Sequence, residues 1–328
     1  MATSPARAPR RITHAGTVAL VGRPNVGKST LLNALLGERL AITSHQPQTT
    51  RDRILGILTS YEAGAQLALL DTPGIHTPRN ELGKRMNAIA DSTAKEADVV
   101  VFMTDVPATP KSEVSAEDLA VLRQVPEGKP LVVVVNKIDK VQPKELLFPF
   151  LEAVGKARDA GAVIPIAALK GKGVERVVKE IARLLPEGEP LYDEEELSDK
   201  PVRFFVAEMV REQILKLTRQ EVPHGVAVTV DAFDDGPKRA RIAVTIHVAK
   251  EAHKAIIIGQ RGAMLTAIGS AARKRAERFL GKPVHLETFV RATPKWFDDP
   301  ARLRELGYAE ESPKKKTTKK HEKKQKKR

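Results

Sequence analysis

Two runs of the chain, Asp98–Thr104 and Leu131–Val135, contain the stretches VVVFM and LVVVV, which are apolar at every position. Strands buried on both faces show this pattern, and they lie in the middle of a sheet that helices cover on either side. Other short apolar runs alternate with segments of helical periodicity between Thr17 and about Leu185. We therefore expect a doubly wound α/β domain with a mostly parallel sheet. The other predicted strands are Thr17–Val21, Arg53–Leu58, Gln66–Leu70 and Val163–Ile166.

The order of predicted elements changes after residue 185. The segment PEGEPLYDEEELSDK (186–200) combines prolines, a glycine and acidic residues, as is typical of a linker. Adjacent strands followed by helices then predict a smaller α+β domain. Its elements are a helix over Val202–Leu217, strands over Gly225–Phe233 and Arg239–Val248, a short helix, a long helix to about Leu280, and a strand over Pro283–Arg291.

Two domains suit a length of 328 residues. We expect a basic extension at 1–13, the first domain at 14–185, an acidic linker at 186–200 and the second domain at 201–311. The last segment, 312–328, is rich in lysine and contains no apolar residue, so it is predicted to be disordered.

Positive charge is concentrated in the second half of the chain. Residues 1–199 carry 25 basic and 26 acidic side chains, whereas 200–313 carry 20 and 14, and 314–328 carry 10 and 1. Polyanions are the partners that this imbalance implies, and both nucleic acid and an anionic membrane surface qualify.

The absence of cysteine excludes a disulfide framework, a cysteine nucleophile and a thiolate metal site. The basic start of the chain is not followed by the apolar run of a signal peptide, and no window reaches the ~20 apolar residues of a membrane span. We expect a cytoplasmic protein, at most peripheral on the inner face of the cell membrane.

A phosphate-binding pattern, GxxxxGK[ST], follows the first predicted strand and opens a predicted helix. Its glycines let backbone N–H groups face a phosphate, and the helix N-terminus adds a positive dipole end. Lys28 is expected to neutralise the β- and γ-phosphate oxygens, and the Ser29 hydroxyl to bind Mg²⁺. The predicted phosphate-binding residues are Gly22, Arg23, Pro24, Asn25, Val26, Gly27, Lys28, Ser29 and Thr30.

A DxxG motif closes the strand QLALL, at the edge of the sheet where the phosphate loop is expected. There Asp71 can hold Mg²⁺ through a water molecule, and the N–H of Gly74 can contact a γ-phosphate; Thr72 and Pro73 complete the motif. In the polar loop that precedes the second strand, Thr49 and Thr50 are candidates to complete the metal site. A plain surface loop explains that segment equally well.

The motif Asn136, Lys137, Ile138 and Asp139 follows strand LVVVV. The Asp139 carboxylate can accept hydrogen bonds from the ring N–H and the exocyclic amino group of guanine, a donor pair that adenine lacks. Asn136 is expected to join this loop to the phosphate loop, and the stem of Lys137 to lie over the base. A backbone N–H in the segment Ala167, Ala168 and Leu169 would provide the remaining base contact.

A GxxG segment lies between two predicted helices of the second domain. Glycines permit the close approach of a sugar–phosphate backbone, and single-stranded RNA is bound in this way. A helix–turn–helix packing unit with a solvated basic face is the structural alternative. Apolar residues at helical spacing, from Met264 to Phe279, are better explained as core, and Trp296 as an anchor for the end of the domain. The predicted RNA-binding residues are Ile258, Gly259, Gln260, Arg261, Gly262, Arg273, Lys274 and Arg278.

The four nucleotide motifs resemble the G1, G3, G4 and G5 boxes of translation-factor-class GTPases. With QEVPHGVAV, KAIIIGQRG and PKWFDD, the chain resembles the Era family of bacterial ribosome-assembly GTPases from about Gly16 to Tyr308. The resemblance implies a P-loop NTPase G domain followed by a small type II KH domain. Implied partners are GTP or GDP, Mg²⁺ and, in the 30S subunit, the single-stranded 3′ end of 16S rRNA; no DNA is expected.

Departures from the family pattern concern hydrolysis and the two ends of the chain. Ile75 and His76 stand where many GTPases carry the glutamine that orients water. The resemblance implies a K⁺ held by Asn25, while His76 is either a base or a solvated loop residue. Ala167 replaces the usual serine of the G5 box, and the N-terminal extension and the lysine-rich tail exceed the family pattern.

We expect a GTP-driven switch that binds pre-ribosomal RNA. Two alternatives stay open: a GTPase that acts at a membrane surface, and an RNA-binding chaperone whose nucleotide site never turns over. The lysine-rich tail could add RNA affinity, hold anionic lipid or only increase solubility.

Overall fold

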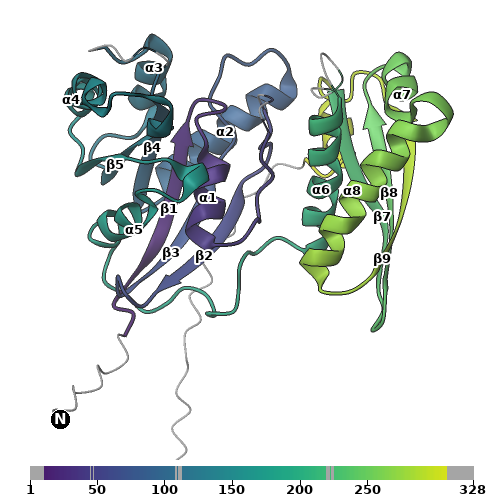
Figure 1. The fold of residues 1–328 in the computed structure, drawn as a ribbon, viewed down its shortest axis with the longest axis horizontal. Helices are drawn as coiled ribbons and strands as arrows, with labels where there is room; N and C mark the ends of the chain where they lie inside the picture. Colours follow the sequence, from purple (N-terminus) through teal and green to yellow (C-terminus); the bar gives the residue numbers. More distant parts are fainter. Residues whose placement is uncertain are drawn as a thin grey trace, which may run out of the picture.

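A computed structural model describes residues 11–308 except 45, 47, 108, 110–112, 219–221 and 223–224. Two bodies lie side by side, and helix α6 (Val202–Leu217) of the second faces the first (Figure 1). The first contains β1 (His14–Gly22), α1 (Lys28–Leu36), β2 (Ile54–Ser60), β3 (Ala65–Asp71), α2 (Glu81–Glu96), β4 (Val99–Asp105), α3 (Ala116–Gln124), β5 (Leu131–Asn136), α4 (Leu147–Ala157), β6 (Ala162–Pro165) and α5 (Val174–Ala182), with short 3₁₀ turns η1 (Ile138–Lys140), η2 (Lys144–Leu146) and η3 (Ala168–Lys170).

The sheet of the first domain has the strand order β2-β3-β1-β4-β5-β6. The strands are parallel apart from β2, which pairs antiparallel with β3 at one edge. The β1 residues that precede the phosphate loop pair with both β3 and β4, at the centre of the sheet. A ligand in a doubly wound fold binds at the carboxyl ends of such strands, so the order of the strands positions the site.

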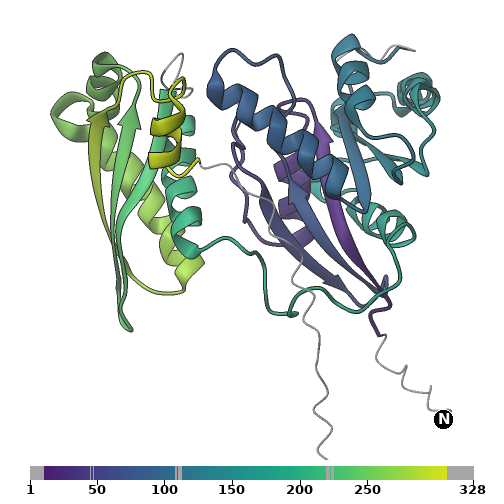
Figure 2. The same cartoon turned by 180° about the vertical axis from the view of Figure 1, so that it is seen from behind.

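Helices cover both faces of this sheet, as the all-apolar strands predict. Successive residues of one strand, such as Val101 and Phe102 of β4, belong to the two opposite cores. Helices α1 and α5 pack on the first face, and α2, α3 and α4 pack on the second. Helix α1 lies in front of the sheet in Figure 1, and α2 lies in front of it in Figure 2, which shows the opposite side.

The second domain is a three-stranded sheet of order β7-β8-β9 with α6, α7 and α8 on one face. Strands β7 and β8 are antiparallel, and β9 is parallel to β8. In the core, apolar residues of α6 and α8, such as Val210 and Ile268, pack against inward-facing residues of the sheet, such as Val244 of β8. The elements are α6 (Val202–Leu217), β7 (Val226–Asp235), β8 (Ala240–Val248), α7 (Glu251–Ile258), η5 (Gln260–Gly262), α8 (Ala263–Leu280), β9 (Val284–Ala292) and α9 (Pro300–Glu305).

The predicted linker is attached to the first domain along much of its length. The Gln66 side chain accepts hydrogen bonds from the N–H groups of Leu191 and Tyr192, and the N–H of Ile57 donates to the carbonyl of Leu197. Tyr192 packs against apolar residues of β2 and β3. Residues 191–197 therefore cover the edge of the sheet at β2.

No single helix among the described residues is long and apolar enough to cross a membrane, although the bent pair Glu251–Ile258 and Gln260–Leu280 passes by length and composition. The predicted disorder of 312–328, and most of the basic extension at 1–13, lie outside the described residues.

Candidate nucleotide site and nucleic-acid interface

The phosphate loop joins β1 to α1. Gly27 immediately before the helix has φ +105°, and a Cβ placed there would lie 2.4 Å from the Asn136 amide nitrogen, so only glycine fits. The buried ammonium of Lys28 donates to the carbonyls of Gly22 and Arg23 at 3.0 Å each. Burial lowers the pKa of Lys28 to about 8, against the opposing effect of Asp71. The buried Lys28 ammonium and the N-terminus of α1 therefore both lie at the phosphate loop.

Three side-chain oxygens meet beside the phosphate loop. The Ser29 hydroxyl lies 2.6 Å from Oδ2 of Asp71 and 2.9 Å from Oγ1 of Thr50, and Thr50 donates to the same Asp71 oxygen at 3.3 Å. The other Asp71 oxygen, Oδ1, is buried and has no hydrogen-bond partner. Burial raises the pKa of Asp71, with Lys28 opposing the rise. Hydroxyl and carboxylate oxygens with one unsatisfied acceptor fit Mg²⁺ or a water bound to it.

The two threonines of the preceding loop take different places. Thr50 is buried at the oxygen cluster, whereas the Thr49 hydroxyl donates to the Gln46 carbonyl at 2.7 Å. The structure thus brings Thr50, and not the Thr49 side chain, to Ser29 and Asp71.

The DxxG turn packs directly against the phosphate loop. A Cβ on Gly74 would lie 2.6 Å from the backbone nitrogen of Pro24, and the N–H of Ile75 donates to the Gly22 carbonyl at 3.2 Å. The Thr72 hydroxyl donates to the carbonyl of Leu20 on β1. This close approach places the Gly74 backbone beside the predicted phosphate cradle.

His76 is held at both ring nitrogens. Nδ1 lies 2.9 Å from the Gly74 carbonyl, and Nε2 lies 2.8 Å from the amide nitrogen of Gln48. Asn87 of α2 bonds both the N–H and the carbonyl of His76. His76 therefore bridges the DxxG turn and the loop that contains Thr50, so it is not the solvated loop residue of one sequence-based alternative. Its role as a base stays a prediction.

The predicted base-binding loops are connected to the phosphate loop. The Asn136 amide donates to the Val26 carbonyl at 2.8 Å, as the sequence predicted, and its oxygen accepts from the N–H of Ala168 at 3.0 Å. The N–H of Ala168, one of the three that the sequence offered as the remaining base contact, thus has Asn136 as its partner here. Leu169 is 87 % exposed.

The charged members of the NKxD motif also have protein partners. The Lys137 ammonium donates to the Asn25 carbonyl and to Asp105, at 2.7 Å each. Lys170 lies 3.0 Å from a carboxylate oxygen of Asp139, and its hydrogen bond lowers the pKa of Asp139. The carboxylate therefore stays ionised as a hydrogen-bond acceptor.

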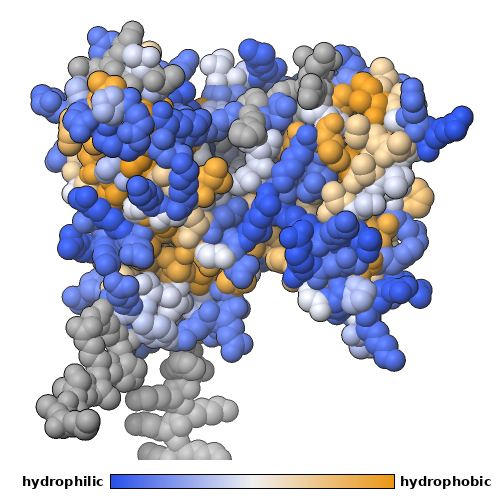
Figure 3. Space-filling view, in the orientation of Figure 1, coloured by the Kyte–Doolittle hydropathy of each residue, from blue (hydrophilic) through white to orange (hydrophobic). Residues whose placement is uncertain are grey.

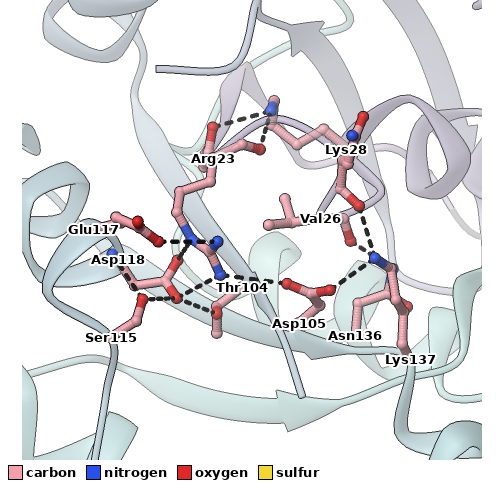
Figure 4. Close-up of polar contacts among 12 residues, drawn as sticks. Arg23, Val26, Lys28, Thr104, Asp105, Ser115, Glu117, Asp118, Asn136 and Lys137 are labelled. Atoms are coloured by element: carbon pink, nitrogen blue, oxygen red, sulfur yellow. Dashed lines mark hydrogen bonds and ion pairs between the residues drawn. The ribbon is translucent and has the colours of Figure 1, made fainter. Parts of the chain in front are cut away.

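Arg23 lies in the phosphate loop, as predicted, but its side chain points away from the Lys28 ammonium (Figure 4). Its guanidinium contacts Asp118 at the start of α3. The backbone of Arg23 belongs to the loop, but its side chain belongs to a separate polar cluster.

The GxxG segment forms the turn η5 between α7 and α8. Gly259 has φ +70° and Gly262 has φ +79°, and Arg261 between them is also left-handed. Gln260 and Arg261 are exposed, whereas Ile258 and Gly262 are half-buried. Figure 3 shows apolar surface at the upper end of this domain, near α7. Ile256 of α7 is exposed.

Comparisons with known proteins agree with this arrangement. Residues 17–137 match the family model described as 50S ribosome-binding GTPase, and residues 221–297 match a KH domain model. The chain is 42 % identical to the GTPase Era of Ruminiclostridium cellulolyticum, over 89 % of this chain and 97 % of that protein. It is 44 % identical to the GTPase Era of Trichlorobacter lovleyi, over 90 % and 97 %. The chain belongs to the Era family of GTPases.

Solved Era structures share the whole fold. A crystal structure of Era with MgGDPNP and nucleotides 1506–1542 of 16S ribosomal RNA superposes with a TM-score of 0.86 at 42 % identity, over 90 % of this chain and 99 % of that one. An Aquifex aeolicus Era variant bound to GDP and AlF₄⁻ gives 0.85 at 42 % identity and the same coverage. The G domain and the KH domain of this Era-family chain are therefore in the positions that Era shows.

The predicted RNA-binding residues of the KH domain separate into two groups. The GxxG loop lies at the start of α8, whereas Lys274 and Arg278 line an open groove at its end, about 18 to 24 Å from Gly262 at 1.5 Å per residue. Arg273 is ion-paired with Glu277. Arg275 belongs to neither group, because it is buried against Glu212 of α6.

Contacts between the G domain and the KH domain were not expected from the sequence. Glu212 is fully buried and accepts hydrogen bonds from Arg39, Arg275 and the N–H of Thr43. Arg211, 1 % exposed, pairs with Glu208 and donates to the Thr49 carbonyl. Charged residues on the otherwise apolar helix FFVAEMVREQILKL are the one sequence signal of this interface.

Trp296 is an anchor, as predicted, and it also joins the domains. It is fully buried in a cluster with Leu82 and Met86 of α2, and its indole N–H donates to the Gly225 carbonyl at 3.1 Å. The guanidinium of Arg51 lies 5.4 Å from the Trp296 ring and donates to the carbonyl of Val226. Such a stacked cation holds the G-domain loop on the KH domain.

Proposed function

We propose that this chain is a GTP-driven switch that binds and hydrolyses GTP and binds 16S rRNA near its 3′ end during assembly of the 30S subunit. One observation carries the proposal: the oxygens of Ser29, Thr50 and Asp71 meet beside the buried Lys28 at the end of β1. A solved relative binds MgGDPNP and a 16S fragment together, which supports both halves of the proposal.

At the phosphate end, the backbone of residues 22–30 would cradle the phosphates and Lys28 would neutralise their oxygens. Ser29 and Thr50 would bind Mg²⁺ directly and Asp71 through a water molecule, which uses its unsatisfied oxygen. When bound, Mg²⁺ neutralises charge on the phosphate oxygens. The Gly74 backbone, which packs against Pro24 of the phosphate loop, would respond to the third phosphate.

At the base end, Asp139 would accept two hydrogen bonds from guanine, and the Lys137 stem would cover the ring. Asn136 joins this loop to the phosphate loop. Ala167, Ala168 and Leu169 would border the base, with the exposed Leu169 at its rim. A site that pairs both guanine donors rejects bases that lack them, because the carboxylate would lose its partners.

For hydrolysis, no glutamine follows the DxxG motif, and the buried Ile75 takes that place. His76 is engaged at both ring nitrogens, which supports a positioning role over that of a base. We propose a K⁺ at Asn25, which has φ +65° in the phosphate loop, as the compensating charge. Hydrolysis faster in K⁺ than in Na⁺ is the expected result; equal rates would remove this ion from the mechanism.

The GxxG loop from Ile258 to Gly262 would bind the single-stranded RNA. Arg273, Lys274 and Arg278 would add phosphate contacts further along α8. The proposal is tested by GTP turnover in Mg²⁺ and by crosslinking in cells to identify the bound RNA. Absence of guanine nucleotide binding would contradict the first half, and crosslinks without 16S rRNA would contradict the second.

Association with anionic membrane stays a prediction, as does a cytoplasmic location. A chain that ends at Ser312 can be compared with the full chain for binding to liposomes and to rRNA. Loss of liposome binding alone would favour a lipid role for the tail.

A further inference from the structure

The side chain of Arg23 joins the phosphate loop to a buried carboxylate. Its Nε donates to one oxygen of Asp118 at 2.7 Å, and its Nη2 donates to the other at 2.9 Å. The Asp118 side chain is 2 % exposed, whereas that of Arg23 is 27 % exposed. Such a bidentate pair fixes orientation as well as distance.

Asp118 is otherwise satisfied by neutral groups. Its Oδ2 accepts from the hydroxyls of Thr104, at 3.0 Å, and Ser115, at 2.7 Å, and its N–H donates back to Ser115 at the start of α3. In the part of the chain that the structure describes, Arg23 is the cation that pairs with it. Removing the guanidinium would leave a buried carboxylate without a countercharge, which is strongly unfavourable.

A second branch leads from Arg23 to the base-binding loop. Asp105, at the end of β4, lies 3.4 Å from the Arg23 guanidinium and 2.7 Å from the Lys137 ammonium. Lys137 in turn donates to the carbonyl of Asn25, two residues beyond Arg23. The contacts close a ring that begins and ends on the phosphate loop (Figure 4).

We propose that Arg23 is a positioning residue for guanine nucleotide: through Asp118 and Asp105 it holds the phosphate loop and the Lys137 stem in their binding arrangement. The inference rests on the proposed GTP site. A preformed arrangement lowers the cost of ordering the loop when nucleotide binds. Among the described residues, the side chains of Arg23, Asp105 and Asp118 form no hydrogen bond with those of Lys28, Ser29 or Asp71, the groups expected beside the reacting phosphate. The effect should therefore fall on nucleotide affinity rather than on turnover.

The test compares Arg23→Gln and Arg23→Lys with Arg158→Gln. Arg158 is a matched control, because its guanidinium binds the carbonyls of Leu122, Val125 and Pro126 at the opposite end of α3. Each full-length variant is measured for GDP Kd in Mg²⁺, for GTP KM and kcat, and for Tm.

We expect Arg23→Gln to raise GDP Kd and GTP KM about tenfold with kcat within about threefold, and Arg23→Lys to have a smaller effect. Arg158→Gln should lower Tm and leave Kd unchanged. The double variant Arg23→Gln, Asp118→Asn should lose less GDP affinity, as binding free energy, than the sum of the losses in the two single variants, since the two groups act as a pair.

Two results would overturn the inference: a Kd within twofold of the parent for Arg23→Gln, or a Kd change that Arg158→Gln matches at equal loss of Tm. If Arg23→Gln does not fold, the same comparison is made with Arg23→Lys. Failure of the parent chain to bind GDP would instead contradict the proposed function, so the two failures are distinguishable.

Discussion

The guanidinium of Arg211, in the first helix of the KH domain, donates a hydrogen bond to the backbone carbonyl of Thr49 in the G domain. The next residue, Thr50, lies at the oxygen cluster with Ser29 and Asp71. One peptide unit therefore separates a contact of the RNA-binding domain from the predicted metal site. A nucleotide that displaces the Thr50 backbone would therefore also displace the acceptor of Arg211.

Replacing Arg211 should uncouple RNA affinity from the nucleotide. We expect the ratio of affinities for a 16S 3′-end oligonucleotide, measured with a GTP analogue and with GDP, to fall to about one in Arg211→Met. Coupling between sites is commonly worth 5- to 150-fold. Arg203→Met changes an exposed arginine of the same helix and should keep the parent ratio. Retention of that ratio in Arg211→Met would argue against this route of coupling.

Lys28→Ala should lower GTP hydrolysis by at least about a hundredfold, because the phosphates lose their buried countercharge. The variant should keep or raise the Tm of the ligand-free protein, since burial lowers the pKa of Lys28 to about 8 and so opposes its charge. Phosphate release and thermal melting are the measurements. Hydrolysis at the parent rate would mean that the activity does not depend on Lys28, and so would contradict the proposed phosphate site.

Asp139→Asn should change base preference from guanine to xanthine, because the amide offers a donor where the carboxylate offered an acceptor. KM for GTP should rise and KM for XTP should fall, each by tenfold or more. Lys170→Gln removes the ion pair with Asp139 but keeps the carboxylate, so it should retain guanine preference. Unchanged selectivity in Asp139→Asn would mean that the base binds elsewhere.

Acid should destabilise the KH domain through His247. Burial lowers the pKa of His247, with Asp231 opposing and Arg291 adding to the shift. The ring is held between the hydroxyls of Thr229 and Thr293. A folded pKa below the unfolded value near 6.5 means that the unfolded chain binds more protons, so stability falls as pH drops below that value.

The comparison for His247 is the loss of Tm between pH 7 and pH 5. His247→Gln should lose less Tm over this range than the parent chain, whereas His285→Gln, on the exposed face of β9, should match the parent. An identical loss in all three proteins would assign the acid sensitivity to other groups.

Local sequence patterns account for the elements and for the nucleotide loops. The helix predicted over Val202–Leu217 is α6 at the same bounds, and the all-apolar runs are the buried central strands β4 and β5. These predictions succeed because burial on both faces and helical periodicity both show in the pattern of apolar residues along a short segment. The phosphate loop follows for the same reason, since its conformation depends on nearby glycines.

Contacts between distant segments were not predictable in this way. Arg275 resembles its exposed neighbours in sequence, yet it is buried against Glu212, 63 residues away. Nor does any local pattern distinguish Arg23, whose side chain leaves the phosphate loop for Asp118. Such pairings depend on how the helices and domains pack, and only the folded chain brings them together.

The attachment of residues 191–197 to the edge of the G-domain sheet limits how far the two domains can separate. After the Ile57 contact at Leu197, only 198–201 precede α6. Four extended residues span at most about 14 Å. The KH domain can thus pivot beside the G domain, but it can separate further only if residues 191–197 first detach from β2. This attached segment therefore acts as a tether whose length limits the distance between the two domains.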